Sequence, residues 1–310
     1  MMPNNSSPTN PRFAIATPED FMRLPATSPL RIALLLIVVA TASALAFSQA
    51  SGQTTFASAK QAEAGLVAAL GNGDTAALVA LFGPGSEALV SSGDDVADKK
   101  SRDQFVAAYE QNHTLRSSGP NQLTLNIGKD LWPLPIPLVK AGDKYYWDGG
   151  AGAQELIYRR IGRNELDAIN VCKGVVAAQK DYAAASHDGN PAGSYAQRIV
   201  SASGTQNGLY WDVNPGEPPS PAGPMLASAN AEGYDTTHRT PYHGYYYRML
   251  KNAKGFGFLA YPADYRSSGV MTFQVSQTGV IYQKDLGENT ADIAGKMTEY
   301  QVDKAWKVVQ

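Results

Sequence analysis

The chain has 310 residues, of which 44% are hydrophobic and 17% are charged, and its formal net charge at pH 7 is -2. This ordinary apolar content excludes disorder along the whole chain, and the length corresponds to one or two domains. The nearly balanced charge, without a basic stripe, excludes nucleic acid as the main partner. A single cysteine, Cys172, excludes an internal disulfide and every cysteine-rich zinc site.

The N-terminal segment has the pattern of an export signal. An apolar run covers residues 32–46 and directly follows Arg31. A positive flank, a short apolar stretch and a small-residue cleavage site define a secretory signal peptide, and cleavage fits after Ala46 or after Ala50. We therefore expect a periplasmic or secreted protein. The alternative is an uncleaved N-terminal anchor, which would be its attachment to the membrane, although the run is short for a span.

The signal and the polar stretch before it, residues 1–50, are set apart from the fold. The true start of the chain is either Met1 or Met22, because residues 22–31 already form a short basic segment before the apolar run. An exported chain of this size that cannot form a disulfide fits a bacterial periplasm or exterior.

The first half of the remaining chain, residues 51–150, begins with helices. Apolar spacing and capping patterns predict three helices, at residues 58–70, 75–82 and 97–112. A strand pattern follows at residues 123–127. Residues 132–137, with a proline at every second position, form an edge strand or an extended arm. Residues 139–147 have the pattern of a hairpin. This order predicts helices with a small curved antiparallel sheet, loosely similar to the cone-shaped folds of nuclear-transport-factor type.

The second half, residues 151–310, begins after the glycine-rich stretch 149–152, which we place as the boundary. A long helix is predicted at residues 154–186, either bent or split in two because Gly162 and Gly174 weaken it. Two shorter helical segments and a terminal helix are predicted at residues 195–201, 224–232 and 290–300. Four strands are predicted at residues 242–250, 255–262, 269–276 and 279–286. We expect an α+β fold in which the long helix packs on this second antiparallel sheet.

Five stretches of the chain carry a family resemblance: residues 159–183, 207–211, 216–224, 241–250 and 268–287. They resemble the bacterial family called domain of unknown function 2950, and the resemblance extends from about residue 56 to the C-terminus. It implies an exported bacterial protein without an established biochemical activity. The second half also resembles the globular part of type IV pilins and pseudopilins, a likeness of fold that does not carry function.

Seven residues form the candidate ligand or interaction surface: Arg159, Arg160, Arg163, Tyr242, His243, Tyr245 and Tyr247. The arginines suit an anion because a guanidinium grips carboxylate and phosphate in a bidentate manner, or else they form salt bridges on the long helix. The tyrosines suit a carbohydrate or peptide surface, or else they pack in the sheet, with two of them on one face. The imidazole of His243 suits acid–base chemistry, or else a hydrogen bond beside a turn.

The chemical motifs of common enzyme classes do not occur in the sequence. There is no nucleophile elbow, phosphate-binding glycine loop or histidine pair with metal-ligand spacing, so we expect no cofactor and no metal. The acidic cluster of Asp94, Asp95 and Asp98 either binds a cation, or Asp95 or Asp98 starts the next helix, and the helix start is the preferred interpretation. Catalytic function is therefore not supported by any motif, although it is not excluded.

Three functions remain open. The first is an exported binding or interaction protein whose partner is an unknown envelope protein or a small ligand. The second is an envelope-directed hydrolase that uses His243 with neighbouring carboxylates and tyrosines. The third is an assembly factor of a pilus-like or secretion-like machine of the envelope, suggested by the pilin-like half.

Overall fold

The computed structural model describes residues 52–235 and 240–309, so the predicted signal segment lies outside the described residues. Helices and strands are mixed, with two antiparallel sheets of five strands each, which confirms the α+β fold class. The helices are α3 (Ala59–Asn72), α4 (Thr75–Phe82), α5 (Glu87–Val90), α6 (Asp95–Gln111), α7 (Ala153–Ala183), α8 (Gly223–Ala231) and α9 (Thr290–Lys296). Every helix in the described ranges is too short or too polar to span a bilayer.

The first sheet has the strand order β1-β2-β4-β5, with β3 paired to β2. Its strands are β1 (His113–Gly119), β2 (Gln122–Ile127), β3 (Trp132–Pro133), β4 (Leu138–Ala141) and β5 (Lys144–Trp147). The predicted hairpin is therefore confirmed as β4 and β5, and the proline-rich stretch contributes the two-residue strand β3. Trp147 is fully buried and its indole N–H donates to the carbonyl of Ala62 over 3.0 Å, which ties this sheet to α3.

Helices α3 and α4 begin and end as their capping residues predict. The side chains of Ser58 and Asp74 accept hydrogen bonds from the first turns, and Gly73 ends α3 in the left-handed region at a φ of 64°. Their buried leucines pack with residues of the first sheet in a core that includes Leu66, Leu125 and Trp147. Burial of such side chains is the main source of stability for a unit of this size.

The long helix α7 is continuous through both of its glycines, so the predicted alternative of two helices is wrong. Gly174 has a packing role: a Cβ at this position would come within 2.9 Å of the sulfur of Met225 on α8. The absence of a side chain at Gly174 therefore lets α8 approach α7 closely.

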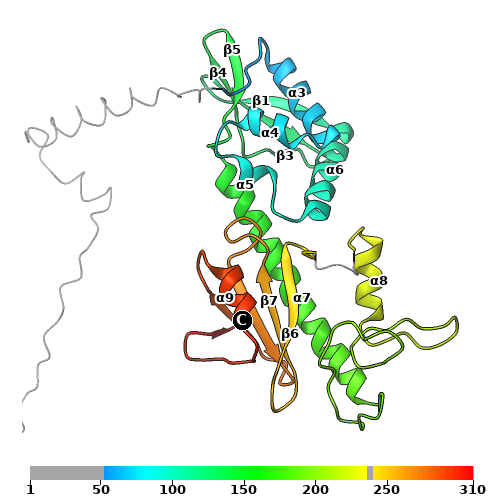
Figure 1. Cartoon of the computed structure of the whole chain (residues 1–310). Helices are drawn as coiled ribbons and strands as arrows, with labels where there is room; N and C mark the ends of the chain where they lie inside the picture. The colour runs from blue at the N-terminus through cyan, green and yellow to red at the C-terminus, as the bar shows by residue number, and fades with distance from the viewer. Residues whose placement is uncertain (1–51, 236–239, 310) are drawn as a thin grey trace, which may run out of the picture. The chain divides into compact units, whose positions relative to one another are not determined.

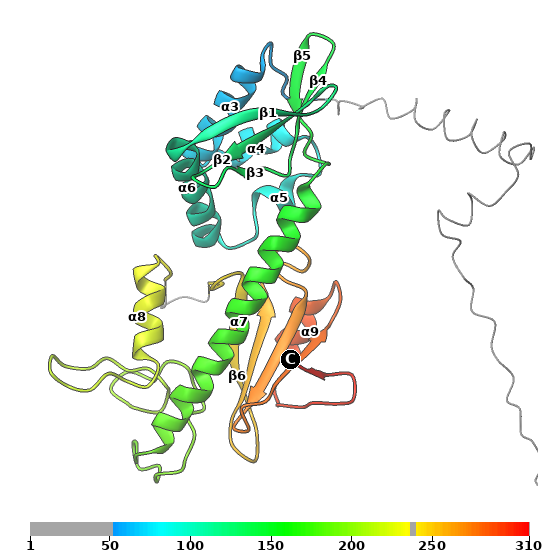
Figure 2. The same ribbon diagram turned by 180° about the vertical axis from the view of Figure 1, so that it is seen from behind.

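The second sheet has the order β10-β9-β8-β7-β6. Its strands are β6 (Tyr245–Leu250), β7 (Gly257–Pro262), β8 (Met271–Ser276), β9 (Ile281–Asp285) and β10 (Lys307–Val308). Figures 1 and 2 show α7 along one face of this sheet and α9 on the other. Tyr245 and Tyr247 belong to the core on the α7 side and Tyr246 to the core on the α9 side, which confirms the predicted alternation.

Two predicted elements are corrected by the structure. Residues 195–201 are not helical, because both ends of the Gln179 amide bond the backbone of Ala196, at 2.7 and 3.0 Å, and Val200 forms a bridge with Tyr210. The terminal helix ends at Lys296 rather than at residue 300, because the following segment pairs with Lys251. Strands β1 and β10 and the short helix α5 are additions that the sequence patterns did not predict.

Candidate functional site

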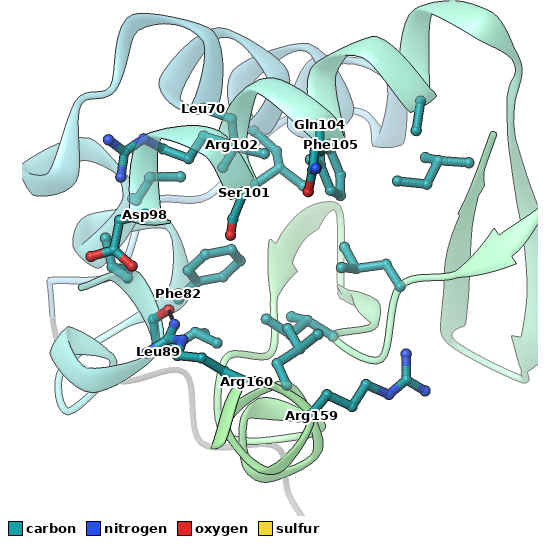
Figure 3. A pocket seen from close by; sticks show the side chains of 18 of the residues that line it. Leu70, Phe82, Leu89, Asp98, Ser101, Arg102, Gln104, Phe105, Arg159 and Arg160 are labelled. Carbon is teal, nitrogen blue, oxygen red and sulfur yellow. Dashed lines mark hydrogen bonds between the residues drawn. The ribbon is translucent and has the colours of Figure 1, made fainter. Parts of the chain in front are cut away.

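A cavity of about 540 Å³ lies among α3, α4, α6, the first sheet and the beginning of α7. Its walls are mainly aliphatic and aromatic: Leu66, Leu70, Leu78, Phe82, Leu89, Val90, Phe105, Ala108, Ile127, Trp132, Leu134, Ile136 and Leu156. Figure 3 shows most of the lining side chains around an open centre, with Leu70, Phe82, Leu89 and Phe105 labelled among the apolar ones. A volume of this size, with apolar walls and few polar groups, is typical of small-molecule sites.

Helix α6 contributes the polar groups on one wall of the cavity. In Figure 3 the hydroxyl of Ser101 points toward the open centre, and the Gln104 amide lies above it. Asp98 also lines the cavity, but both of its carboxylate oxygens are occupied by Ser92, which donates from its backbone N–H at 2.8 Å and from its hydroxyl at 2.7 Å. Asp98 is therefore part of the local fold rather than a group that is available to a ligand.

Arg160 has a structural role at the edge of the cavity. Its guanidinium donates to the carbonyl of Ala88 at 2.8 Å and to that of Leu89 at 2.5 Å, which closes the C-terminal end of α5. Burial lowers the pKa of Arg160, and the nearby charges of Asp98 and Asp264 oppose that effect. Because its donors are used on backbone carbonyls, we assign Arg160 to the fold.

Arg102, Arg159 and Arg163 form a cationic rim around the same cavity. Arg159 forms an ion pair with Glu155, one turn earlier on α7, and its guanidinium carbon lies 5.9 Å from the centre of the Trp132 ring. Figure 3 places the head group of Arg159 on the opposite side of the cavity from that of Arg102. With one carboxylate among three guanidinium groups, the rim favours a negatively charged group of a ligand.

His243 lies in a second place, between two carboxylates. Its Nδ1 is 3.1 Å from Oδ2 of Asp167 on α7, and its Nε2 is 2.9 Å from Oε2 of Glu232 at the end of α8. An imidazole can donate to two carboxylates only when it carries both ring protons. As arranged, neither ring nitrogen is left for a substrate proton.

The backbone explains why a histidine sits at this point. His243 and Gly244 both have positive φ, 50° and 74°, and Tyr242 pairs with Tyr245 across them, as in a type I′ turn. Histidine is enriched among the few non-glycine residues that adopt a positive φ, and the two carboxylates help to hold it in this turn. A Cβ at Gly244 would lie 2.4 Å from the Asn164 side chain, which makes glycine necessary there.

A polar network extends from His243 to the start of α6. Glu232 also pairs with Lys100 of α6 at 2.9 Å and accepts a hydrogen bond from the Tyr242 hydroxyl at 3.3 Å. Burial alone would raise the pKa of Glu232, but the hydrogen bonds from Lys100 and His243 outweigh it and leave that pKa below its ordinary value of 4.5. The network therefore joins α6, α7, α8 and the turn before β6.

The predicted tyrosines lie apart from the arginines. Tyr245 is fully buried and donates to the carbonyl of Met271 at 2.9 Å, and Tyr247 donates to the carbonyl of Tyr242 at 3.3 Å. Burial raises the pKa of both Tyr245 and Tyr247, and it raises the pKa of Tyr242 to about 12. Tyr242 and Tyr247 also line a smaller apolar pocket of about 180 Å³. The seven predicted residues are thus distributed over the edge of the cavity, the core between α7 and the second sheet, and the His243 network.

The acidic cluster lies at the start of α6, as the preferred interpretation states, but the residue that caps the helix is Asp94 rather than Asp95 or Asp98. Asp94 caps the helix, Asp98 binds Ser92, and Asp95 is exposed. No group of three or more histidine, cysteine or acidic residues suited to a metal ion occurs among the described residues.

Several residues of the cavity and of the His243 network were not predicted from the sequence. The walls of the cavity come from distant stretches of the chain, and the partners of His243, Asp167 and Glu232, are 76 and 11 positions away from it in the sequence. One signal was present in the sequence: Trp132 is an aromatic residue among prolines, which gives it little chance of burial in a regular sheet.

Comparison with known proteins gives one match. No curated protein and no solved structure shows significant similarity to the chain. The family model described as "Protein of unknown function (DUF2950)" matches residues 53–309, which covers nearly all of the described structure and agrees with the resemblance seen in the sequence. The chain therefore belongs to the DUF2950 family.

Proposed function

We propose that this protein is an exported bacterial binding protein whose cavity holds an amphiphilic molecule with an anionic head group. The observation that carries the proposal is the pairing of an apolar cavity of about 540 Å³ with a rim of three arginines. The apolar walls suit an acyl or isoprenoid chain, since each buried methylene contributes about 0.8 kcal/mol. The rim suits a carboxylate or phosphate at one end of that chain.

Export rests on the sequence pattern of residues 32–46, with its positive flank and small-residue cleavage sites. Cell fractionation tests this part of the proposal. We expect the processed protein in the periplasm or medium, with its N-terminus after Ala46 or Ala50. An unprocessed protein in the cytoplasm would contradict it.

The geometry around His243 favours binding over hydrolysis. A general base needs a nitrogen that can accept the proton of the attacking group, whereas both nitrogens of His243 face carboxylates at 3.1 and 2.9 Å. The cavity, in contrast, has space and an excess of positive charge at its rim. We therefore place the main function in the cavity and a structural role at His243.

Fluorescence titration with dansyl-undecanoate tests the binding proposal. We expect undecanoate to displace the probe at least tenfold better than undecanol, because the two ligands differ mainly in the anionic group that the arginines recognise. Arg159→Gln combined with Arg163→Gln should remove most of this preference and leave undecanol unaffected. Arg198→Gln is the matched control, since Arg198 is exposed and does not line the cavity.

Two results would contradict the proposal. One is a probe that does not bind at all. The other is binding that does not distinguish the carboxylate from the alcohol and does not respond to the rim variants.

A further inference from the structure

The first half of α7 has one face in the core and one face in solvent. Ile161, Asn164 and Ala168 are buried at 8%, 4% and 0% exposure. An α-helix turns by about 100° per residue, and this turn gives each residue an angular position around the helix axis. The residues on the side away from these three buried side chains fall within an arc of about 140°. These outward residues are Tyr158, Arg159, Gly162, Arg163 and Leu166.

The outward face of α7 carries an unusual concentration of exposed apolar groups. Tyr158 is 63% exposed, Leu166 is 64% exposed, and the neighbouring Trp132 is 61% exposed. They are the three most exposed large hydrophobic side chains in the part of the chain that the structure describes. The Arg159 guanidinium, 5.9 Å from the centre of the Trp132 ring, connects Trp132 to this face. We call these residues, Trp132, Tyr158, Arg159, Arg163 and Leu166, the α7 surface.

The charge of the α7 surface is positive. Arg159 and Arg163 lie on it, Lys173 continues the same arc farther along the helix, and Glu155 is the acidic residue that pairs with Arg159. Asp167 lies at the edge of the arc and faces His243 instead. Aromatic rings and arginines on one helix face, with isolated aliphatic groups between them, are typical of helices that lie at a lipid–water interface.

We propose that the α7 surface docks on an anionic phospholipid bilayer. A protein partner would need packed, shape-complementary pockets around such aromatic residues, whereas a bilayer interface accepts separated rings and guanidinium groups without them. The surface is also continuous with the cavity, because Trp132, Arg159 and Arg163 line both. Docking would bring the mouth of the cavity to the headgroup layer, where an amphiphile could pass between bilayer and protein. The docking goes beyond the proposed function and can be tested without any cavity ligand.

Vesicle sedimentation tests the docking. We expect the protein to bind vesicles that contain phosphatidylglycerol more strongly than vesicles of phosphatidylcholine alone, with binding that falls as salt is added. Tyr158→Ser combined with Leu166→Ser should lower the partition coefficient on both kinds of vesicle. Arg159→Gln combined with Arg163→Gln should lower it about tenfold or more on the anionic vesicles alone.

Matched controls are available elsewhere on the chain. Ile293→Ser combined with Val308→Ser removes two apolar side chains that are also exposed, at 38% and 52%. Arg198→Gln combined with Lys254→Gln removes the same charge from other exposed positions. Both pairs should leave vesicle binding within a factor of two. All variants share one N-terminal segment, so its contribution cancels in the comparison.

A second readout is the tryptophan emission of the protein minus that of its Trp132→Phe variant. We expect this difference to shift to shorter wavelength on anionic vesicles, because the Trp132 ring leaves water. Equal vesicle binding by the parent and the α7-surface variants would overturn the docking. A parent protein that does not bind anionic vesicles but still binds dansyl-undecanoate would also overturn the docking. That result would not contradict the proposed function. Vesicle binding without probe binding would overturn the proposed function and leave the docking.

Discussion

The backbone N–H of Gly244 donates a hydrogen bond of 2.7 Å to the carboxylate of Asp94, although the two residues are 150 positions apart. The same carboxylate caps α6 through the N–H of Ala97 at 2.9 Å and accepts from the Tyr234 hydroxyl at 3.2 Å. Asp94 is almost fully buried, at 1% exposure. One side chain therefore starts the helix that forms a wall of the cavity and also fixes the turn that holds His243.

The first prediction concerns the stability provided by Asp94. Asp94→Ala should lower the free energy of unfolding by about 2–4 kcal/mol, because it removes a helix cap and leaves the Gly244 N–H and the Tyr234 hydroxyl without their acceptor. Denaturant unfolding measures the loss. The control is Asp95→Ala, one residue along and exposed, which should change stability by less than about 0.5 kcal/mol. Equal effects of the two variants would show that Asp94 does not have this double role.

The second prediction concerns the pH dependence of the His243 network. The folded pKa of Glu232 lies below its ordinary value of 4.5, so its ionised form is favoured in the folded state. The stabilisation is therefore present above pH 4.5 and is lost as the pH falls through the lower, folded pKa. Glu232→Gln should lower stability by about 1 kcal/mol at pH 7, a figure that allows for partial solvent screening of the pair.

The difference between the parent and Glu232→Gln should disappear in acid, where Glu232 is itself protonated. Unfolding curves at a series of pH values from neutral to about pH 3 measure it. The control is Glu288→Gln, at an exposed position outside the network, which should follow the parent at every pH. A Glu232→Gln deficit that stays constant down to the lowest pH would show that the charge of Glu232 is not its source.

The third prediction concerns the thiol of Cys172. Burial in the core between α7 and the second sheet raises its pKa to about 12, so the reactive thiolate is absent at neutral pH. The folded protein should not react with iodoacetamide at pH 8, whereas the unfolded chain should take up one equivalent. Fast labelling of the folded protein would mean that the α7 core opens readily.

The fourth prediction concerns alkaline stability. Burial raises the pKa of Tyr242 to about 12 and raises the pKa of Tyr234, Tyr245 and Tyr247 as well. These phenols are neutral when folded, so their stabilising effect is complete below pH 10 and is lost as the pH rises above it. A phenolate titration followed by absorbance should show that these four tyrosines ionise at higher pH than an ordinary tyrosine. Ionisation of all 16 tyrosines around pH 10 in protein that stays folded would contradict the structure.

The elements that local chemistry determines could be predicted from the sequence. Helix α4 has the predicted bounds because Asp74 caps it and a glycine follows it, and β6 has the predicted alternation of its tyrosines. The irregular form of residues 195–201 could not be predicted, because it depends on the hydrogen bonds between the Gln179 amide on α7 and the backbone of Ala196. Where a buried side chain forms hydrogen bonds with the backbone, this tertiary contact determines the local conformation rather than the local sequence pattern.

The candidate site was predictable only in part. The sequence favoured a salt-bridge network for the arginines of α7, with an anion-binding group as the alternative. The Arg159–Glu155 pair forms as predicted, Arg160 donates to backbone carbonyls, and Arg159 and Arg163 line the cavity. This division follows from the angular positions of the three residues on α7 and from the placement of α5. The carboxylates beside His243 belong to Asp167 on α7 and to Glu232 at the end of α8, and no spacing in the sequence predicts that they meet it.

Two neighbouring alanines on α6 provide the test of whether an amphiphile occupies the cavity. Ala108 lines the cavity, whereas Ala107 is exposed and does not. The measurement is the affinity for dansyl-undecanoate of Ala108→Phe and of Ala107→Phe, each checked for an unchanged melting temperature. We expect Ala108→Phe to weaken binding at least tenfold, because its ring fills the space of the acyl chain, and Ala107→Phe to bind like the parent. Equal affinity of both variants would contradict binding in the cavity and would place the ligand outside it.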